Sequence, residues 1–404
     1  MAIICWGNLA KSADDTQRIE QAIQGYVEDH NENVNAHQIE GSSLYMHRVN
    51  SELDHLAESV KNFHIGYSFR AYKAVVDVGG KGDYTNIQDA IDYVNGLGGG
   101  KILILPGSYV QSDDLVMYSG IDLEGLDETT TIIDFDGLAK GMQLVGVFGG
   151  PIRNCYLFGF TIEGSKAATA GAITLKYCDD IFIENIYFES NRQVSPAQGY
   201  DIYVENSHGI KVRDCHNGEA NANYYLKDSH EIFIEDILFE NTGNKGIILD
   251  NVYDLHIGNL KIHQMTGNFI STLNSVSGLH LYKLIFKDCN HDKIYLNAVT
   301  DCLIEGVLME SVANPNEPGI EINTSERVSV LNCNIKDHVD GILFVSNIYC
   351  TANNNICNSN SRYGINISDA DCDKCIVVGN NLRDNTSGGL NDLGTNTEKG
   401  HNVI

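Results

Sequence analysis

The sequence predicts a mainly β protein in which the chain coils into a parallel β-helix behind an N-terminal α-helical segment. A repeat of 22 to 29 residues, two short strand motifs in each repeat and polar turn residues between them support this fold class. The first apolar residues of successive repeats are Ile181, Ile210, Ile232, Leu255, Leu279, Cys302 and Val328. A repeat of this length, built of short alternating strands, is typical of a solenoid.

Residues 1–70 differ from the repeats and predict helices with coiled-coil spacing. Two runs of residues keep the heptad spacing: Ile19, Ile23, Tyr26 and His30, and then Met46, Val49, Leu53, Leu56, Val60 and Phe63. Each run is shorter than three heptads, so helices of this length need partners to be stable. We expect the partners to come from other copies of the chain, in a homotrimer or a homodimer. The alternative is a helical hairpin docked on its own chain.

Residues 74–404 predict the β-helix itself, in which each coil pairs with the next at about 4.8 Å. A second strand motif lies between the repeat cores, for example "GAITL" at 171–175 and "GIIL" at 246–249. Alternation places the apolar residues of both motifs inside the coil. One polar position also recurs, and we expect a structural turn ladder there because Asx residues tolerate the left-handed conformation. Its members are Asn185, Asp214, Asp236, Asn259 and Asn332.

The stretch "GGKGDYTNIQDAI", followed by "GGGKILILPGSYV" (79–110), resembles the opening of the pectate-lyase-like right-handed β-helix superfamily. The resemblance covers residues 74–400 and implies a right-handed, pectin-lyase-like solenoid whose N-terminal end is covered by a short helix. A helix at about 85–96 fits this role, because Ile87, Ala90, Ile91 and Val94 form one apolar face. The glycines are then turn residues, since the G-x-x-x-x-G-K-[ST] phosphate loop is absent.

The N-terminal segment carries "WGNLAKSADDTQRIEQAI" and an H-x-x-x-x-x-A-H element from His30 to His37, before a second predicted helix. In these features it is similar to the N-terminal segments of phage and prophage tail-fibre and tailspike proteins. The similarity implies a homotrimeric virion protein that folds in the host cytoplasm. It also implies that this segment attaches to tail or baseplate proteins and that the β-helix meets a host surface polysaccharide.

Composition excludes several other classes of protein. The net charge of −27, from 27 Lys+Arg and 54 Asp+Glu, repels phosphate backbones, so we expect no nucleic-acid partner. No run of 18 apolar residues predicts a membrane span, and the start "MAIICWGNLAKSADD" lacks a secretory signal. The 11 cysteines indicate reduced thiols stacked in the core, with a zinc role for "CDKC" as the weaker alternative. We predict no cofactor and no metal.

The outward residues of the second strand motif form two columns along the predicted solenoid. Tyr203, Tyr225 and Tyr295 belong to the first column and predict an exposed aromatic stripe that binds sugar rings. Burial of the same stripe between the subunits of a trimer is an equal alternative. The register of residues 268–273 stays open at this point.

Glu205, Asp250 and Glu321 are the candidate catalytic carboxylates, and Lys227 lies between the first two as a candidate substrate-binding residue. Glu205 and Asp250 are two coils apart, or about 9–10 Å, close to the separation found in inverting glycosidases. A charge ladder is the interpretation that we favour, because Lys176, Glu205, Lys227 and Asp250 alternate in sign. The full motifs of polygalacturonases, pectate lyases and pectin methylesterases do not appear.

We therefore expect a tailspike or tail-fibre protein that binds host surface polysaccharide. Depolymerisation of that polysaccharide, by glycoside hydrolase or lyase chemistry, is an additional activity that the fold allows. One alternative is a free polysaccharide-degrading enzyme, and another is a purely structural fibre or scaffold protein. Because one fold hosts many functions, these alternatives depend on the surface residues and not on the repeats.

Overall fold

The computed structural model describes residues 72–404, except for residues 137, 139–140, 166–170, 190–198, 219–221, 241–244, 266, 290–292 and 312–315. Residues Ala71–Ile404 form one compact unit. The predicted helical segment, residues 1–70, lies outside the described residues, so its helices and heptads stay a prediction. In the part of the chain that the structure describes, no helix is long and apolar enough to cross a membrane.

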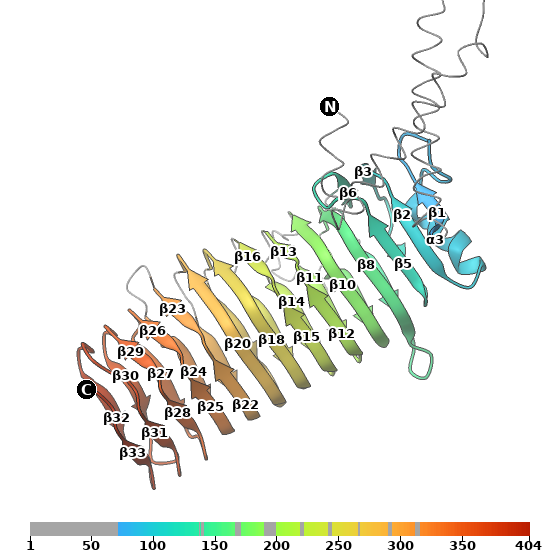
Figure 1. Cartoon of the computed structure of the whole chain (residues 1–404). Coiled ribbons are helices and arrows are strands. Elements are labelled where there is room, and N and C mark those ends of the chain that lie inside the picture. The colour runs from blue at the N-terminus through green and yellow to red at the C-terminus, as the bar shows by residue number, and fades with distance from the viewer. Residues whose placement is uncertain are drawn as a thin grey trace, which may run out of the picture. The chain divides into compact units, whose positions relative to one another are not determined.

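Two parallel sheets wind around one core, and each strand pairs with the equivalent strand of the next coil (Figure 1). Sheet B has twelve strands: β4 (Leu115–Val116), β7 (Met142–Val145), β9 (Gly171–Lys176), β11 (Tyr200–Glu205), β14 (Ala222–Lys227), β17 (Lys245–Asp250), β19 (Asn268–Thr272), β21 (Ile294–Asn297), β24 (Ile320–Asn323), β27 (Asp340–Val345), β30 (Tyr363–Ile367) and β32 (Gly388–Asp392). The prediction of a mainly β solenoid with parallel coils is confirmed.

Sheet A contains the other 21 strands and carries the repeat cores that the sequence showed. They are β1 (Tyr72–Val76), β2 (Gly100–Ile104), β3 (Gly107–Val110), β5 (Ile121–Gly125), β6 (Thr131–Asp134), β8 (Ile152–Glu163), β10 (Cys178–Glu189), β12 (His208–Arg213), β13 (His216–Asn217), β15 (His230–Glu235), β16 (Leu238–Glu240), β18 (Val252–His263), β20 (Val276–Lys287), β22 (Val299–Glu305), β23 (Leu308–Glu310), β25 (Glu326–Leu331), β26 (Asn334–Lys336), β28 (Thr351–Asn353), β29 (Ile356–Asn358), β31 (Ile376–Val378) and β33 (Glu398–Gly400).

A short helix lies at the N-terminal end of the solenoid, next to β1 and β2 (Figure 1). This helix, α3 (Ile87–Gly96), falls inside the predicted range. The Asn86 side chain caps it by accepting a hydrogen bond from the Asp89 amide at 3.2 Å. Its buried residues are the four predicted ones, Ile87, Ala90, Ile91 and Val94. Their apolar face therefore covers the first coil, where the core would otherwise meet water.

The core is a set of apolar columns that run along the solenoid. Ile181 pairs with Ile210, Ile210 with Ile232, and Ile232 with Leu255, and the side chains of these four residues are all buried. The repeat starts chosen from the sequence are therefore one inward column, as predicted. Because equivalent residues lie about 4.8 Å apart, each side chain packs on its counterparts in the coils before and after it.

The predicted turn ladder is also confirmed, because all of its Asx members adopt the left-handed conformation, with φ between 52° and 58°. The same position is also left-handed in coils where no Asx residue stands: Lys283 has a φ of 53° and Gly306 a φ of 65°. The geometry of the coil therefore demands this conformation, and apart from glycine, Asx residues adopt it more readily than other residues.

The ten cysteines in the described part of the chain are all buried and unpaired. Burial raises the pKa of Cys178 to about 12 and the pKa of Cys333 to about 11, which keeps these thiols protonated at neutral pH. Their predicted role as small apolar side chains is thus confirmed. Across the described ranges, no group of three or more His, Cys, Asp or Glu side chains is arranged to hold a metal ion.

Substitution of Asn259, in the turn ladder, tests whether backbone conformation decides stability there. Asn259 has a φ of 55°, and its side chain also donates a hydrogen bond to Asp236. We expect Asn259→Val to lower the unfolding free energy by about 1–2 kcal/mol, because a branched side chain resists the left-handed region. Asn259→Gly should cost much less, because glycine accepts this conformation readily. Thermal unfolding followed by circular dichroism would compare the two variants, and equal losses would show that the hydrogen bond matters and the conformation does not.

Candidate functional site

The outward columns of sheet B have the register that the sequence predicted. Tyr203 pairs with Tyr225, Tyr225 with Ile248, and Tyr295 with Glu321. The coil that the sequence left open is β19, which places Ser271 between Ile248 and Tyr295. The predicted site residues therefore share one face of one sheet, but Glu321 lies three coils beyond Asp250, or about 14 Å along the solenoid.

The tyrosines of this face do not form the expected exposed stripe. Tyr203 is only 8% exposed, and with Tyr200 and Ile248 it forms a small apolar cluster against which Tyr225 packs. The centroids of the Tyr203 and Tyr225 rings are 5.4 Å apart in an edge-to-face arrangement. The expectation of exposure is wrong for Tyr203, because neighbouring coils supply rings that cover one another. Tyr295 stands apart and is half-buried, with the Lys293 ammonium 5.1 Å from its ring centroid.

Glu205 lies between two lysines, as the charge-ladder interpretation expected. Its carboxylate is 3.1 Å from the Lys176 ammonium and 2.9 Å from that of Lys227. Desolvation alone would raise the pKa of Glu205, but hydrogen bonds and charge attraction from Lys227 and Lys176 outweigh it and lower the pKa below its ordinary value. A carboxyl group held in its ionised form is poorly suited to act as a general acid.

Asp250 and Glu321 are also bound to neighbouring side chains. Asp250 is 8% exposed and accepts hydrogen bonds from the Tyr225 hydroxyl, at 2.7 Å, and from the Asn274 amide. Glu321 is 2.5 Å from the Lys293 ammonium and accepts a 2.8 Å hydrogen bond from Asn323. These contacts explain why Asp250 can be buried and Glu321 half-buried, since partners replace the lost water. The catalytic roles of Glu205, Asp250 and Glu321 stay predictions.

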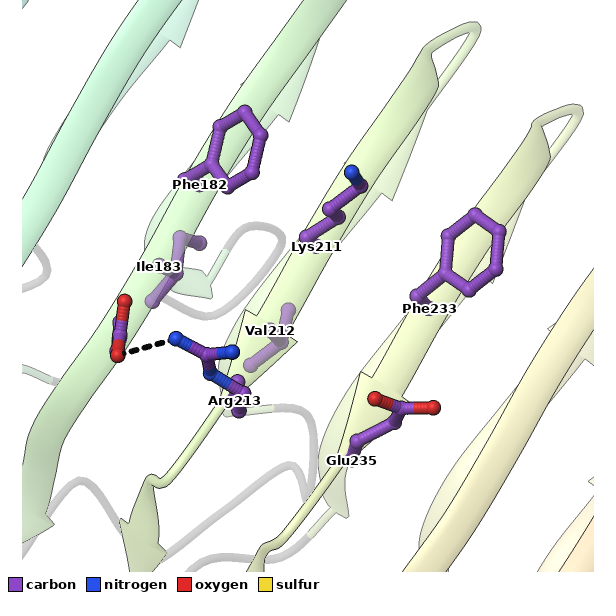
Figure 2. Close-up of a pocket in the computed structure, with 8 residues that line it drawn as sticks. Phe182, Ile183, Lys211, Val212, Arg213, Phe233 and Glu235 are labelled. Carbon is purple, nitrogen blue, oxygen red and sulfur yellow. Dashed lines mark hydrogen bonds and ion pairs between the residues drawn. The ribbon is translucent and has the colours of Figure 1, made fainter.

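A groove of about 340 Å³ lies on the other sheet, on the outer face of β10, β12 and β15 (Figure 2). Figure 2 shows the Phe182 and Phe233 rings on the outer two strands, with Lys211 between them. The Lys211 ammonium is 4.8 Å from the Phe182 ring centroid and 5.9 Å from that of Phe233. Phe182 is 40% exposed. The groove therefore presents aromatic surface and an ammonium group to solvent.

Charged side chains form the second side of this groove. The Arg213 guanidinium is 2.6 Å from the Glu184 carboxylate, which also accepts a 2.8 Å hydrogen bond from the Tyr156 hydroxyl. On β15, two strands away from Glu184, the Glu235 carboxylate accepts a hydrogen bond from the Tyr282 hydroxyl. Tyr282 reaches Glu235 across Gly258, where an added Cβ would stand 2.1 Å from its ring. Sheet A thus holds fixed hydrogen-bonding groups beside the aromatic rings.

The alignment of the groove residues can be predicted from the repeat in the sequence. Phe182, Lys211 and Phe233 occupy the same outward position of three consecutive repeats, and their pairing follows from the repeat alone. The predicted site residues all come from the second strand motif, which forms sheet B, so none of them lies on this face of sheet A. Chemically, aromatic rings beside a guanidinium and carboxylates suit a ligand with apolar faces and many hydroxyl groups.

Comparison with known proteins identifies the class of fold. A family model described as "Right handed beta helix region" matches residues 270–401. The tailspike of E. coli bacteriophage HK620 in complex with a pentasaccharide superposes with a TM-score of 0.53 at 15% identity, over 76% of this chain and 62% of that chain. Tailspike protein 3 of bacteriophage CBA120 gives a TM-score of 0.57 at 13% identity, over 82% and 60% of the two chains.

An enzyme shares the fold to a similar degree. The catalytic unit of the thermostable GH87 α-1,3-glucanase from Streptomyces thermodiastaticus superposes with a TM-score of 0.58 at 10% identity, over 78% of this chain and 65% of that chain. A comparison of the sequence with curated proteins gave no significant match. The chain is a right-handed parallel β-helix, a fold that it shares with phage tailspikes and with a carbohydrate-active enzyme. At these identities the likeness shows the fold alone.

Removal of the central charge of the sheet B ladder should lower stability in a pH-dependent way. The lowered pKa of Glu205 means that its contribution is present above the unfolded-state pKa and is lost as the pH falls through the folded-state pKa. We expect Glu205→Gln to cost about 1 kcal/mol at pH 7. The difference from the parent protein should shrink at acid pH.

Thermal unfolding of the parent protein and of Glu205→Gln between pH 3 and pH 7 would measure this effect. The matched control is Glu398→Gln, at an exposed glutamate near the C-terminal end of the described chain. A loss for Glu205→Gln that is the same at every pH would contradict the ion-pair explanation. Such a result would indicate that the substitution disturbs packing and does not act through the ion pairs.

Proposed function

We propose that this chain is a tailspike-like protein that binds a host surface polysaccharide through the outer face of sheet A. The observation that carries the proposal is the groove between Phe182 and Phe233, in which aromatic surface lies beside the Glu184–Arg213 ion pair. The fold shared with the HK620 tailspike, which was solved with a pentasaccharide, supports it by analogy.

Sheet A suits this role better than the face that the sequence favoured. On sheet B, the predicted site residues Tyr203 and Asp250 are buried, and so is Ile248 next to them. A large ligand therefore cannot reach these side chains. On sheet A, Phe182 is exposed, and the Arg213 side chain is 54% exposed although it forms an ion pair. A polymer reaches such an open lateral groove without threading its ends, whereas it would be excluded from a closed cavity.

The chemistry of the groove matches the two kinds of surface that a sugar presents. The C–H face of a pyranose is apolar and packs on aromatic side chains, while its hydroxyl groups form hydrogen bonds with polar side chains, most strongly with charged ones. Arg213 and Glu184 already hold each other in place at 2.6 Å, so little side-chain entropy is lost when a ligand binds. Lys211 adds an ammonium group between the two rings, which can donate hydrogen bonds to sugar hydroxyl groups.

We also propose the assembly that the N-terminal resemblance implies. Residues 1–70 would attach the protein to a phage tail and join three copies through short heptads, after folding in the host cytoplasm. The rivals remain a free polysaccharide-degrading enzyme, which is expected to be monomeric, and a structural fibre protein with no affinity for sugars. Each rival differs from the proposal in a property that is directly measurable.

The first measurement of function is binding of the full chain to a printed array of bacterial capsular and O-antigen polysaccharides. We expect Phe182→Ala to weaken binding of the strongest ligand by about twofold to tenfold, since an aromatic contact contributes roughly 0.5–1.5 kcal/mol. The matched control is Phe148→Ala, because Phe148 is 92% exposed on the turn between β7 and β8, away from the groove.

The outcomes separate the three classes of protein. Binding that both phenylalanine variants retain would move the site away from the groove, and no binding by the parent protein would support the structural rival. Release of new reducing ends from a bound polysaccharide would add a depolymerase activity. Glu205→Gln, Asp250→Asn and Glu321→Gln would then test the three predicted carboxylates.

The solution mass of the full chain tests the proposed assembly. We expect light scattering to give three times the chain mass of 44.5 kDa. The reason is that predicted helices with fewer than three heptads need partner helices to be stable. Polar substitution of Leu53 and Leu56, in the second heptad run, should shift the mass toward that of one chain. A monomeric parent protein would refute the proposed trimer and favour the alternative of a free enzyme.

A further inference from the structure

A ladder of stacked rings runs along the N-terminal ends of three consecutive strands of sheet A. His208, His230 and Tyr253 are equivalent residues of β12, β15 and β18. The His208 and His230 rings are 5.0 Å apart at an interplanar angle of 3°, and the His230 and Tyr253 rings are 4.6 Å apart at 5°. Since parallel rings follow one another from coil to coil, their faces point along the solenoid and not out from the sheet.

The ladder ends abruptly at Tyr253. The equivalent residue of the next coil is Ser277, followed by Thr300 and Glu326. A serine is too small to cover a phenol ring, and Tyr253 is 45% exposed. Among the described residues, His230 is the only ring that stacks on Tyr253. One face of Tyr253 is therefore open, and it looks along the solenoid over the two hydroxyl side chains.

Polar groups surround this open face on the strands β20, β22 and β25, which lie side by side in Figure 1. Ser277 and Thr300 are half-buried, and each carries a hydroxyl group. Glu326 stands in the same column and contacts Arg327. Arg327 also forms a bidentate ion pair with Asp301, at 2.6 and 3.0 Å.

We propose that the open face of Tyr253 is a sugar-stacking subsite. A pyranose ring would take the place of the next ring in the ladder, with its apolar face on Tyr253 and its hydroxyl groups on Ser277 and Thr300. This inference rests on the proposed function.

A ligand of another class fits this arrangement less well. A flat apolar ligand would cover the Tyr253 face but leave the Ser277 and Thr300 hydroxyls without partners, which costs free energy on burial. A polyanion such as nucleic acid is repelled by the chain's net charge of −27 and by Glu326 in the same column. A pyranose satisfies both halves of the site, because it offers an apolar face and several hydroxyl groups together.

The test uses the full chain and the polysaccharide that binds best on the array of bacterial capsular and O-antigen polysaccharides. Hexasaccharide fragments of that polysaccharide are then titrated by calorimetry. We expect Tyr253→Ala to weaken binding about tenfold, while Tyr253→Phe, which keeps the ring, stays within about twofold of the parent. The matched control is Tyr349→Ala, since Tyr349 is 47% exposed but its ring is engaged by the Lys374 ammonium at 4.8 Å.

A second pair of variants keeps the proposal testable if the alanine variant fails to fold. Ser277→Phe extends the ring ladder into the subsite, so it should raise the thermal stability and abolish the contribution of Tyr253 to binding. Tyr253→Trp places an indole in the ladder of a chain whose only other tryptophan is Trp6. We expect the emission of this indole to shift when the hexasaccharide is added.

The outcomes of these titrations distinguish the subsite from the proposed function. If the parent binds and both Tyr253→Ala and Ser277→Phe bind equally well, the subsite is refuted while the proposed function stands. If Tyr253→Trp binds the hexasaccharide with unchanged emission, the subsite is refuted as well. If the parent binds no glycan on the array, the proposed function fails and this inference fails with it.

Discussion

The structure depends on the parallel pairing of each coil with the next at a constant register. This pairing places equivalent side chains about 4.8 Å apart, so each side chain contacts the equivalent side chains of the coils before and after it. Inside, the rule is favourable, because apolar residues such as Ile210, Ile232 and Leu255 pack on their own kind. The backbone must turn at fixed points to keep the register, and the left-handed residues of the turn ladder meet that requirement.

The same stacking also brings charged side chains outside the core close together, and the chain contains both an attractive and a repulsive example. On sheet B, Lys176, Glu205 and Lys227 alternate in sign, so stacking produces attraction. In the turn ladder, Asp214 and Asp236 are successive carboxylates, and desolvation together with the Asp236 charge raises the pKa of Asp214. A raised carboxyl pKa favours folding at acid pH and opposes it as the pH rises, so this ladder and the sheet B ladder respond to pH in opposite directions.

Stacking also builds surfaces that can meet a ligand. The column of Phe182, Lys211 and Phe233 and the neighbouring column of His208, His230 and Tyr253 present aromatic groups at the spacing of the coils. A rigid solenoid holds such groups in line over many coils with little flexibility to lose on binding. An extended polymer is the kind of ligand that uses a linear array of this sort, which is the physical basis of the proposed function.

The repeat alone determined the parallel β-helix, the inward columns, the left-handed turn positions and the buried face of the capping helix, because each depends on spacing along the chain. The register of sheet B was also predictable, except in the coil of β19. Only the tertiary structure decided which outward side chains remain accessible. Tyr203 is covered by its neighbours, and Tyr282 reaches Glu235 only because Gly258 lies between them. Accessibility depends on what neighbouring coils bring to the same place, and a repeat pattern does not contain that information.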